Sequence, residues 1–253
     1  MDKVLAVIHY EYKMQLRRPA VWGMVLAATV LSMLDNFPSA GNLSRLEFLK
    51  DPAYFVYRVM SLDCLILLFG LMFLLAGRFP LDRKTGMSSL LIVSALRKGQ
   101  YVSGKLTAGF LCTLSMVGIF LALNTMIYFL AAPFELSFLE CMIPLIKAVI
   151  ISGLPSSLFV SFGSVALPAV MDLRLFYILA AMVFGLNAAY VGSADTMPFY
   201  LMTSGDLVRL IWMHPNWPFV DLTSVLANGG FLVGCSLIFG VMLLLKRKFW
   251  RGE

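Results

Sequence analysis

Long apolar runs constrain this chain more than any other feature. Residues 106–132 read LTAGFLCTLSMVGIFLALNTMIYFLAA, without one charged side chain. A membrane-spanning helix needs about 20 mostly apolar residues. Only 13% of the 253 residues are charged, against about 25% in a soluble domain. Five more runs approach or exceed the spanning length: 20–36, 54–77, 143–170, 175–194 and 225–245. The sequence therefore predicts an all-α polytopic membrane protein with six transmembrane helices in a single domain, residues 1–253.

The basic residues predict the orientation of these spans. Segments 1–19, 78–105, 171–174 and 246–253 hold four, six, one and four Lys or Arg residues, whereas the opposite segments hold only Arg45, Lys50 and Arg209. Short cytoplasmic loops are enriched in Lys and Arg. We therefore expect both termini in the cytoplasm and an even number of crossings. The net charge of +6 then reflects membrane orientation, and we expect no nucleic-acid partner.

Two further segments are predicted to be helical without crossing the membrane. Residues 1–19 place apolar side chains on one side and cations mostly opposite, which favours a helix on the inner membrane surface. Pro19 would turn the chain into the first span, which Asp35 and Asn36 end. The outer segment 195–224 alternates apolar pieces with Pro and Gly, and we expect two short re-entrant helices there, or else an aromatic-rich surface loop. Span six and a cytoplasmic tail then complete the chain, in residues 225–253.

A near-match to a phosphate-binding loop lies before the third span. Residues 99–105, GQYVSGK, fit G-x-x-x-x-G-K-[ST] except that Leu106 stands in the hydroxyl position, which should contact Mg²⁺. A working loop lies between a strand and a soluble helix, whereas an uncharged predicted span follows here. The longest cytoplasmic segment is also too short for a nucleotide-binding domain. We conclude that this stretch is not a nucleotide site.

The segment around this stretch predicts a different element. Residues 78–105 read RFPLDRKTGMSSLLIVSALRKGQYVSGK. The middle is apolar between two basic clusters, so we expect a short amphipathic cytoplasmic helix, started by Thr85 or Ser88 and ended by Gly99. Such a helix is either a docking element or a membrane-surface helix. Gly104 and Lys105 would lead the chain back into the membrane, with Lys105 as an anchor at the inner surface.

Residues 82–105 resemble the cytoplasmic loop of type 2 ABC transporter permeases. That loop runs acidic-basic-x-x-Gly, then an apolar stretch, then a basic residue, an aromatic residue and Gly-Lys. The matching positions are Asp82, Arg83, Gly86, Leu90, Leu91, Arg97, Tyr101, Gly104 and Lys105. Asp82 stands where Glu is usual, and Ala95-Leu96 where a proline is often found. Residues 9–22, HYEYKMQLRRPAVW, resemble the entry helix of the same family.

The resemblance implies a non-catalytic permease subunit of an ATP-driven exporter in a bacterial plasma membrane. Two permeases, identical or siblings, would form the path for a hydrophobic peptide, a lipid or a drug. A cytoplasmic ATPase dimer would carry ATP and Mg²⁺, with no cofactor in this chain. The coupling helix would contact the ATPase through Asp82, Arg83, Lys84, Gly86, Leu90, Leu91, Arg97 and Lys98. For each cation, the alternative is that it only follows the positive-inside bias.

Three charges within the predicted spans, Arg58, Asp63 and Lys147, are candidates for a gate or a polar lining, because a charge in the membrane costs about 2.5–3.5 kcal/mol on insertion scales. Arg58 and Asp63 would point about 140° apart on an α-helix. Asp63 and Lys147 lie at comparable depths and could pair, while Arg58 could meet Glu135 or Glu140. A structural ion pair, or a Lys147 that reaches the head groups, is the competing interpretation. An alternative function is an ion-coupled secondary transporter that uses Asp63 and Lys147.

Other chemistry finds little support in the sequence. The four cysteines are scattered in or beside apolar runs, and the two histidines, His9 and His214, are far apart. We expect no metal site in this chain. No H-E-x-x-H motif and no nucleophile–base pair is evident, which argues against an intramembrane enzyme.

Overall fold

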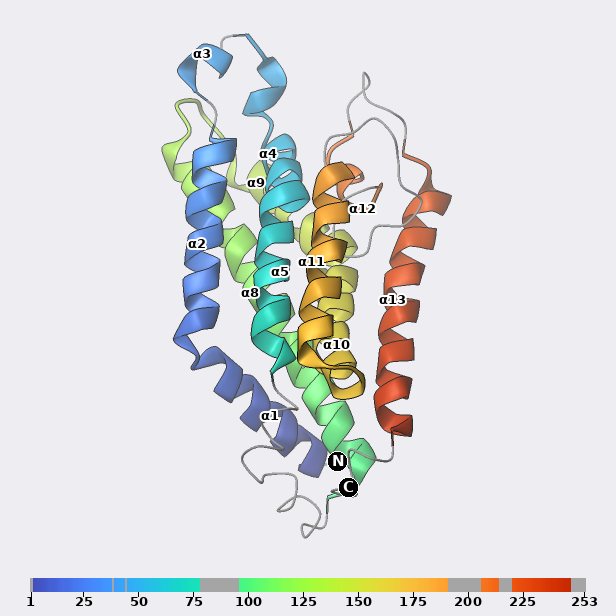
Figure 1. Ribbon diagram of the computed structural model, residues 1–253. Coiled ribbons are helices and arrows are strands. Elements are labelled where there is room, and N and C mark those ends of the chain that lie inside the picture. The colour runs from blue at the N-terminus through green and yellow to red at the C-terminus, as the bar shows by residue number, and fades with distance from the viewer. Residues whose placement is uncertain are drawn as a thin grey trace.

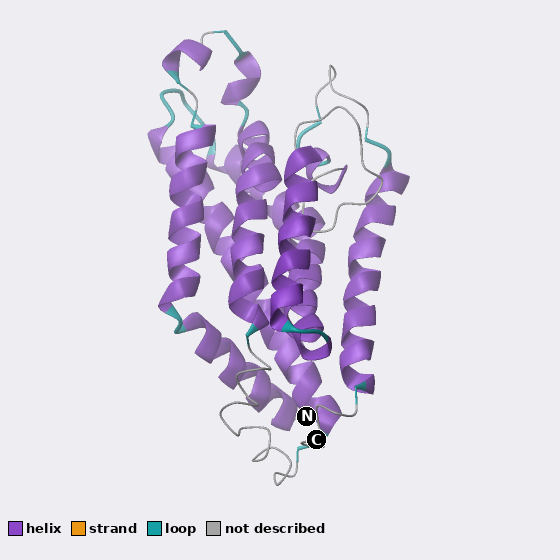
Figure 2. Cartoon of the chain, in the orientation of Figure 1, coloured by secondary structure: helices purple, strands orange, loops and turns teal. Residues whose placement is uncertain are grey.

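The chain folds into a bundle of long helices (Figures 1 and 2). The computed structural model describes residues 2–37, 39–43, 45–77, 96–190, 206–213 and 220–246, and within them every regular element is a helix. The elements are α1 (Asp2–Leu16), α2 (Pro19–Asn36), α3 (Ala40–Leu43), the 3₁₀ helix η1 (Glu47–Lys50), α4 (Pro52–Arg58), the π-helical turn η2 (Val59–Asp63), α5 (Cys64–Ala76), α8 (Lys98–Ala131), α9 (Phe138–Ala148), the π-helical turn η3 (Val149–Gly153), α10 (Leu154–Val170), α11 (Leu173–Tyr190), α12 (Asp206–Arg209) and α13 (Leu222–Leu245).

Five helices are long and apolar enough to cross a membrane. They are α2, the continuous helix Pro52–Ala76, α8, the continuous helix Phe138–Val170, and α13. A shorter apolar helix, α11, occupies the position of the predicted fifth span and stands beside the others in the bundle (Figure 1). The all-helical architecture is therefore confirmed within the described residues, and five of the helices have the length and apolar composition of membrane spans.

Helix α8 is much longer than predicted, because it begins at Lys98 rather than after Lys105. Its 34 residues correspond to about 51 Å. The backbone N–H of Arg97 donates to Oε1 of Gln100 at 3.0 Å and closes the first turn. The prediction that Gly99 ends a helix is wrong, since Gly99 lies in this first turn. The GQYVSGK stretch thus forms the first turns of a long helix rather than a loop.

Helix α1 is confirmed as a separate helix that ends just before Pro19, the first residue of α2. One side of α1 packs along the first turns of α8. A Cβ atom on Gly104 would lie 2.8 Å from Cγ1 of Val7, so the absence of a side chain at Gly104 lets the two helices approach closely. Part of the α1 surface that was expected to face lipid therefore contacts protein.

The bundle is organised around α10, which packs against α5, α8 and α13. Its contact surfaces carry small residues, a feature that lets membrane helices approach closely. Gly163 of α10 lies against Phe239 of α13, and Gly240 of α13 lies against Phe162 of α10. The serines of η3 and α10 are fully buried as well: Ser152, Ser156, Ser157, Ser161 and Ser164.

An aromatic cluster closes the end of the bundle opposite α1. The Tyr54 ring lies 4.7 Å from that of Trp212, and Nε1 of Trp212 donates to Oδ2 of Asp51 at 2.8 Å. Asp51 also caps α4 by accepting from the N–H of Ala53. Trp212 is therefore buried against protein. Asp206 begins the four-residue α12, and residues 191–205 and 214–219 lie outside the described residues.

Asp221 fixes the start of α13 at the same end of the bundle. Its carboxylate accepts from the backbone N–H of Thr223 at 3.2 Å and also from the Thr223 hydroxyl. These hydrogen bonds hold the pKa of Asp221 below its usual range. An aspartate in this position satisfies backbone donors that the first helical turn leaves unpaired.

Candidate functional site

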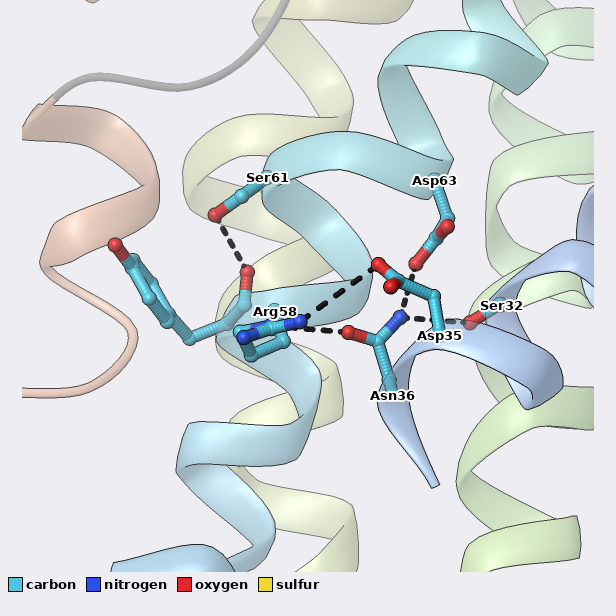
Figure 3. A network of polar contacts seen from close by, with 7 residues as sticks. Ser32, Asp35, Asn36, Arg58, Ser61 and Asp63 are labelled. Atoms are coloured by element: carbon cyan, nitrogen blue, oxygen red, sulfur yellow. Dashed lines mark hydrogen bonds and ion pairs between the residues drawn. The ribbon is translucent and has the colours of Figure 1, made fainter. Parts of the chain in front are cut away.

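A polar cluster joins helix α2 to the helix Pro52–Ala76, two of the helices that are long and apolar enough to cross a membrane (Figure 3). Nη2 of Arg58 lies 3.6 Å from Oδ2 of Asp35. Nε of Arg58 donates to Oδ1 of Asn36 at 3.0 Å, and the same asparagine donates through Nδ2 to the carboxylate of Asp63. Nδ2 also lies 3.4 Å from Oγ of Ser32. One asparagine of α2 therefore bridges a cation and a carboxylate of the neighbouring helix Pro52–Ala76.

The π-helical turn η2 makes this bridge possible. In an α-helix, five residues separate two side chains by about 140°. In η2, the N–H of Cys64 instead bonds to the carbonyl of Val59, five residues earlier, which brings residues five apart towards the same side of the helix. Arg58 and Asp63 consequently meet the same Asn36. The prediction that they point away from each other is wrong, because it assumed an uninterrupted α-helix.

The two ends of the cluster differ in their access to solvent. The side chains of Arg58 and Asp35 are 43% and 52% exposed, whereas Asp63 is buried. Arg58, Asp35 and Asn36 line a cavity of about 220 Å³, whose wall also includes Tyr54 and Tyr128. Asp63 is not among the residues that line this cavity, so Asn36 stands between the cavity and the buried carboxylate.

The ion pairs that the sequence suggested from the depths of these residues in the membrane are absent among the described residues. Asp63 bonds to Asn36, while Lys147 is exposed and makes no ion pair within the described part of the chain. Arg58 pairs with Asp35 rather than with Glu135 or Glu140. The reason is geometric: Lys147, Glu135 and Glu140 line a second cavity, which contains neither Arg58 nor Asp63.

A second polar cluster is buried at the opposite end of the bundle. Nζ of Lys105 lies 3.6 Å from Oε1 of Glu11, with side-chain exposures of 0% and 8%, and it bonds to Oη of Tyr101 at 2.9 Å. The expectation that Lys105 anchors the chain at the membrane surface is therefore wrong. Lys105 ties α8 to α1 instead. Next on the same face of α1, Gln15 is buried, and its amide has no hydrogen-bond partner in the described structure.

The predicted ATPase contacts fall mostly beyond what the structure describes. Asp82, Arg83, Lys84, Gly86, Leu90 and Leu91 lie outside the described residues. Arg97 precedes the first turn of α8, and Nζ of Lys98 donates to the carbonyl oxygens of Leu244 and Lys246 at 2.6 and 2.8 Å. Lys98 therefore fastens the start of α8 to the end of α13.

The sequence did not predict Ser32, Asp35 and Asn36 as members of the site, because polar residues at the end of an apolar run indicate only where the span ends. A signal was nevertheless present. The spacing i, i+3 and i+4 places all three on one face of α2, at the end of an otherwise apolar helix.

The described residues contain no group of three or more His, Cys, Asp and Glu side chains arranged to hold a metal ion. Comparison with models of protein families, with curated proteins and with solved structures finds no match to this chain.

Proposed function

We propose that this chain is the membrane-spanning subunit of an ATP-binding cassette transporter and acts in export. In this proposal six helices cross the membrane, α11 being the fifth crossing. A second permease completes the path, and a separate cytoplasmic ATPase dimer supplies the energy. The observation that carries the proposal is the order of motifs from Asp82 to Lys105, which resembles the coupling loop of type 2 permeases.

The arrangement of the helices supports this proposal. Helix α5 ends and α8 begins at the end of the bundle where α1 lies and α13 finishes (Figure 1). The segment 78–95 connects α5 to α8, so both of its attachment points are at that end. The same end carries most of the basic residues, and a cytoplasmic partner would bind there.

The decisive test reverses two charges in the proposed coupling helix. We expect the double substitution Arg83→Glu and Lys84→Glu to weaken co-purification of the ATPase by about tenfold or more, because each reversal removes an attraction and adds a repulsion. Arg45→Glu with Lys50→Glu is the matched control, since these cations lie at the opposite end. Equal recovery of the ATPase with both double variants would contradict the assignment.

The buried Asp63 supports a second candidate, an ion-coupled carrier. An intramembrane carboxylate bonded to an uncharged asparagine, behind a cavity lined by Arg58 and Asp35, resembles a site at which a proton or cation exchanges. The purified chain in liposomes, without any ATPase, discriminates between the two candidates. Uptake driven by an ion gradient and abolished by Asp63→Asn would establish the carrier, and the absence of such uptake would exclude it.

A further inference from the structure

The larger cavity at the outer end has the properties of a ligand site. Its volume of about 560 Å³ falls in the range of roughly 300–1,000 Å³ typical of small-molecule sites. It lies between the start of α4 and the face of α9 that carries Glu140, Ile143, Pro144 and Lys147. These α9 residues are spaced i, i+3, i+4 and i+7, so one helical face forms one wall of the cavity.

The cavity has an apolar floor and a rim with charges of both signs. Pro52 and Pro144 are buried in the floor, together with Ile211. Lysines and glutamates on the rim are all exposed: Glu47, Lys50, Glu135, Glu140 and Lys147. Within the described residues none of them forms an ion pair, although Glu140 also accepts from the N–H of Ser137. Asp51 also lines the cavity, but its two oxygens already accept from Ala53 and Trp212. The lining therefore holds two cations and four anions, and three of the anions remain available to a ligand.

An exposed apolar stripe leads away from the cavity along the same helix. Ile143 lines the cavity and is more than half exposed, and Ile146 and Ile150 continue the exposed surface along α9 and η3. Because this helix is one of those long enough to span the membrane, the stripe faces lipid tails. A molecule whose head group occupied the cavity would lay its tail along these isoleucines.

We propose that this cavity binds the head group of a zwitterionic phospholipid, with the phosphate at Lys147 and Lys50 and the ammonium group at the rim glutamates. The opposite charges of the rim complement the opposite charges of such a head group. A cavity lining with two more anions than cations disfavours a lipid whose head group is only anionic. The site goes beyond the transport function and does not depend on the ATPase assignment.

The test uses the full chain, stripped of lipid in detergent, with native mass spectrometry to count bound lipid. Phosphatidylethanolamine and phosphatidylglycerol of identical acyl chains are the probes. We expect wild type to bind one phosphatidylethanolamine about tenfold more tightly than phosphatidylglycerol, because only phosphatidylethanolamine carries an ammonium group that can make a charge-assisted contact with the rim glutamates. Lys147→Glu should remove this preference. Lys13→Glu, at an exposed position of α1 far from the cavity in sequence, should leave it intact.

A reversal of specificity separates the proposal from simple loss of folding. The double substitution Glu47→Lys with Glu135→Lys converts the cavity lining to four cations and two anions, so phosphatidylglycerol should become the preferred lipid. The proposal is overturned if wild type binds both lipids equally. It is also overturned if Lys147→Glu and the double Glu47→Lys, Glu135→Lys variant both retain the wild-type preference, because binding would then take place elsewhere on the protein surface.

Discussion

Lys105 illustrates how a single residue can be misassigned from its neighbours in sequence. Lysine is rarely fully buried unless it is paired, and here Glu11 and Tyr101 supply the partners. The partner that matters is 94 positions away in the sequence, so local motifs cannot reveal it. A Gly-Lys pair that superficially matched a phosphate-binding loop serves instead as a contact between helices.

The buried pair makes a quantitative prediction about stability. Lys105→Met should leave the Glu11 carboxylate buried without its cation and lower the free energy of unfolding by about 3–5 kcal/mol. The double variant Lys105→Met with Glu11→Met should recover most of this loss, because no lone charge remains. Thermal unfolding of wild type, both single variants and the double variant in detergent measures the coupling between the two charges. Additive losses in the double variant would show that the two charges are not coupled.

Asp63 shows a different limit of prediction at the residue scale. The sequence identifies it correctly as an unusual charge within a span, and the structure indeed buries it. Its partners were not predictable, because regular α-helical geometry was assumed through residues 59–63. A π-helical turn has no strong sequence signature of its own, so the direction of every side chain beyond it is uncertain from sequence.

At the scale of elements, the contact of α1 with α8 depends on one missing side chain. Gly104 meets Val7 closely, whereas a Cβ atom on Gly118 of the same helix would have no such neighbour within 4 Å. Alanine at either position would change the helix propensity, but only alanine at Gly104 would also disturb the packing against α1. Gly230 and Gly234 of α13 have the spacing of a G-x-x-x-G packing motif, but both have open space where a Cβ would stand.

We predict that Gly104→Ala loosens α1 and that Gly118→Ala does not. The added methyl group would lie 2.8 Å from Val7, so one of the helices must shift, at a cost of about 1–3 kcal/mol. Adding Val7→Ala should restore stability by removing the opposing methyl groups. Limited proteolysis within α1, together with thermal unfolding, provides the measurement. Equal behaviour of the two alanine variants would contradict the close approach.

The prediction of the helices themselves was better than the prediction of their ends. The apolar runs located all five long helices and α11, because a run of about 20 apolar residues has few alternatives in a membrane. The starts of α8 and α9 were placed eight and five residues too late. The first turn of α8, Lys98 to Tyr101, is polar, and hydrophobicity does not detect polar helical turns. In α9 the charged Glu140 separates Phe138 and Leu139 from the longer apolar run that follows. In α9, Ser137 and Glu140 form a capping box that the sequence does display.

At the scale of the whole molecule, the helices alternate in direction, so that α1 and the end of α13 lie together (Figure 1). The positive-inside bias predicts that this end faces the cytoplasm. The cavities that contain Arg58 and Lys147 would then open towards the outside. This orientation is a prediction from charge, and it can be measured directly.

Cysteine labelling of intact cells tests the orientation. Glu47→Cys is at the end predicted to face the outside and should react with a membrane-impermeant maleimide, whereas Lys13→Cys should react only after the membrane is permeabilised. Cys64, Cys112 and Cys141 are buried and Cys235 is half-buried, so background labelling by the native chain should be low. Labelling of position 13 in intact cells would reverse the proposed topology.

Helix α8 connects the two ends of the molecule mechanically. Near one end Lys105 is tied to α1, and near the other the hydroxyl of Tyr128 donates to the carbonyl of Leu49 at 3.1 Å, with the Tyr128 ring stacked on Phe55. These two attachments are about 35 Å apart along the axis at 1.5 Å per residue. A rigid lever of that length, tilted by about 5°, would displace its far tip by about 3 Å. Such a displacement equals the length of a hydrogen bond, so a small rocking movement at α1 would suffice to detach Tyr128 from Leu49.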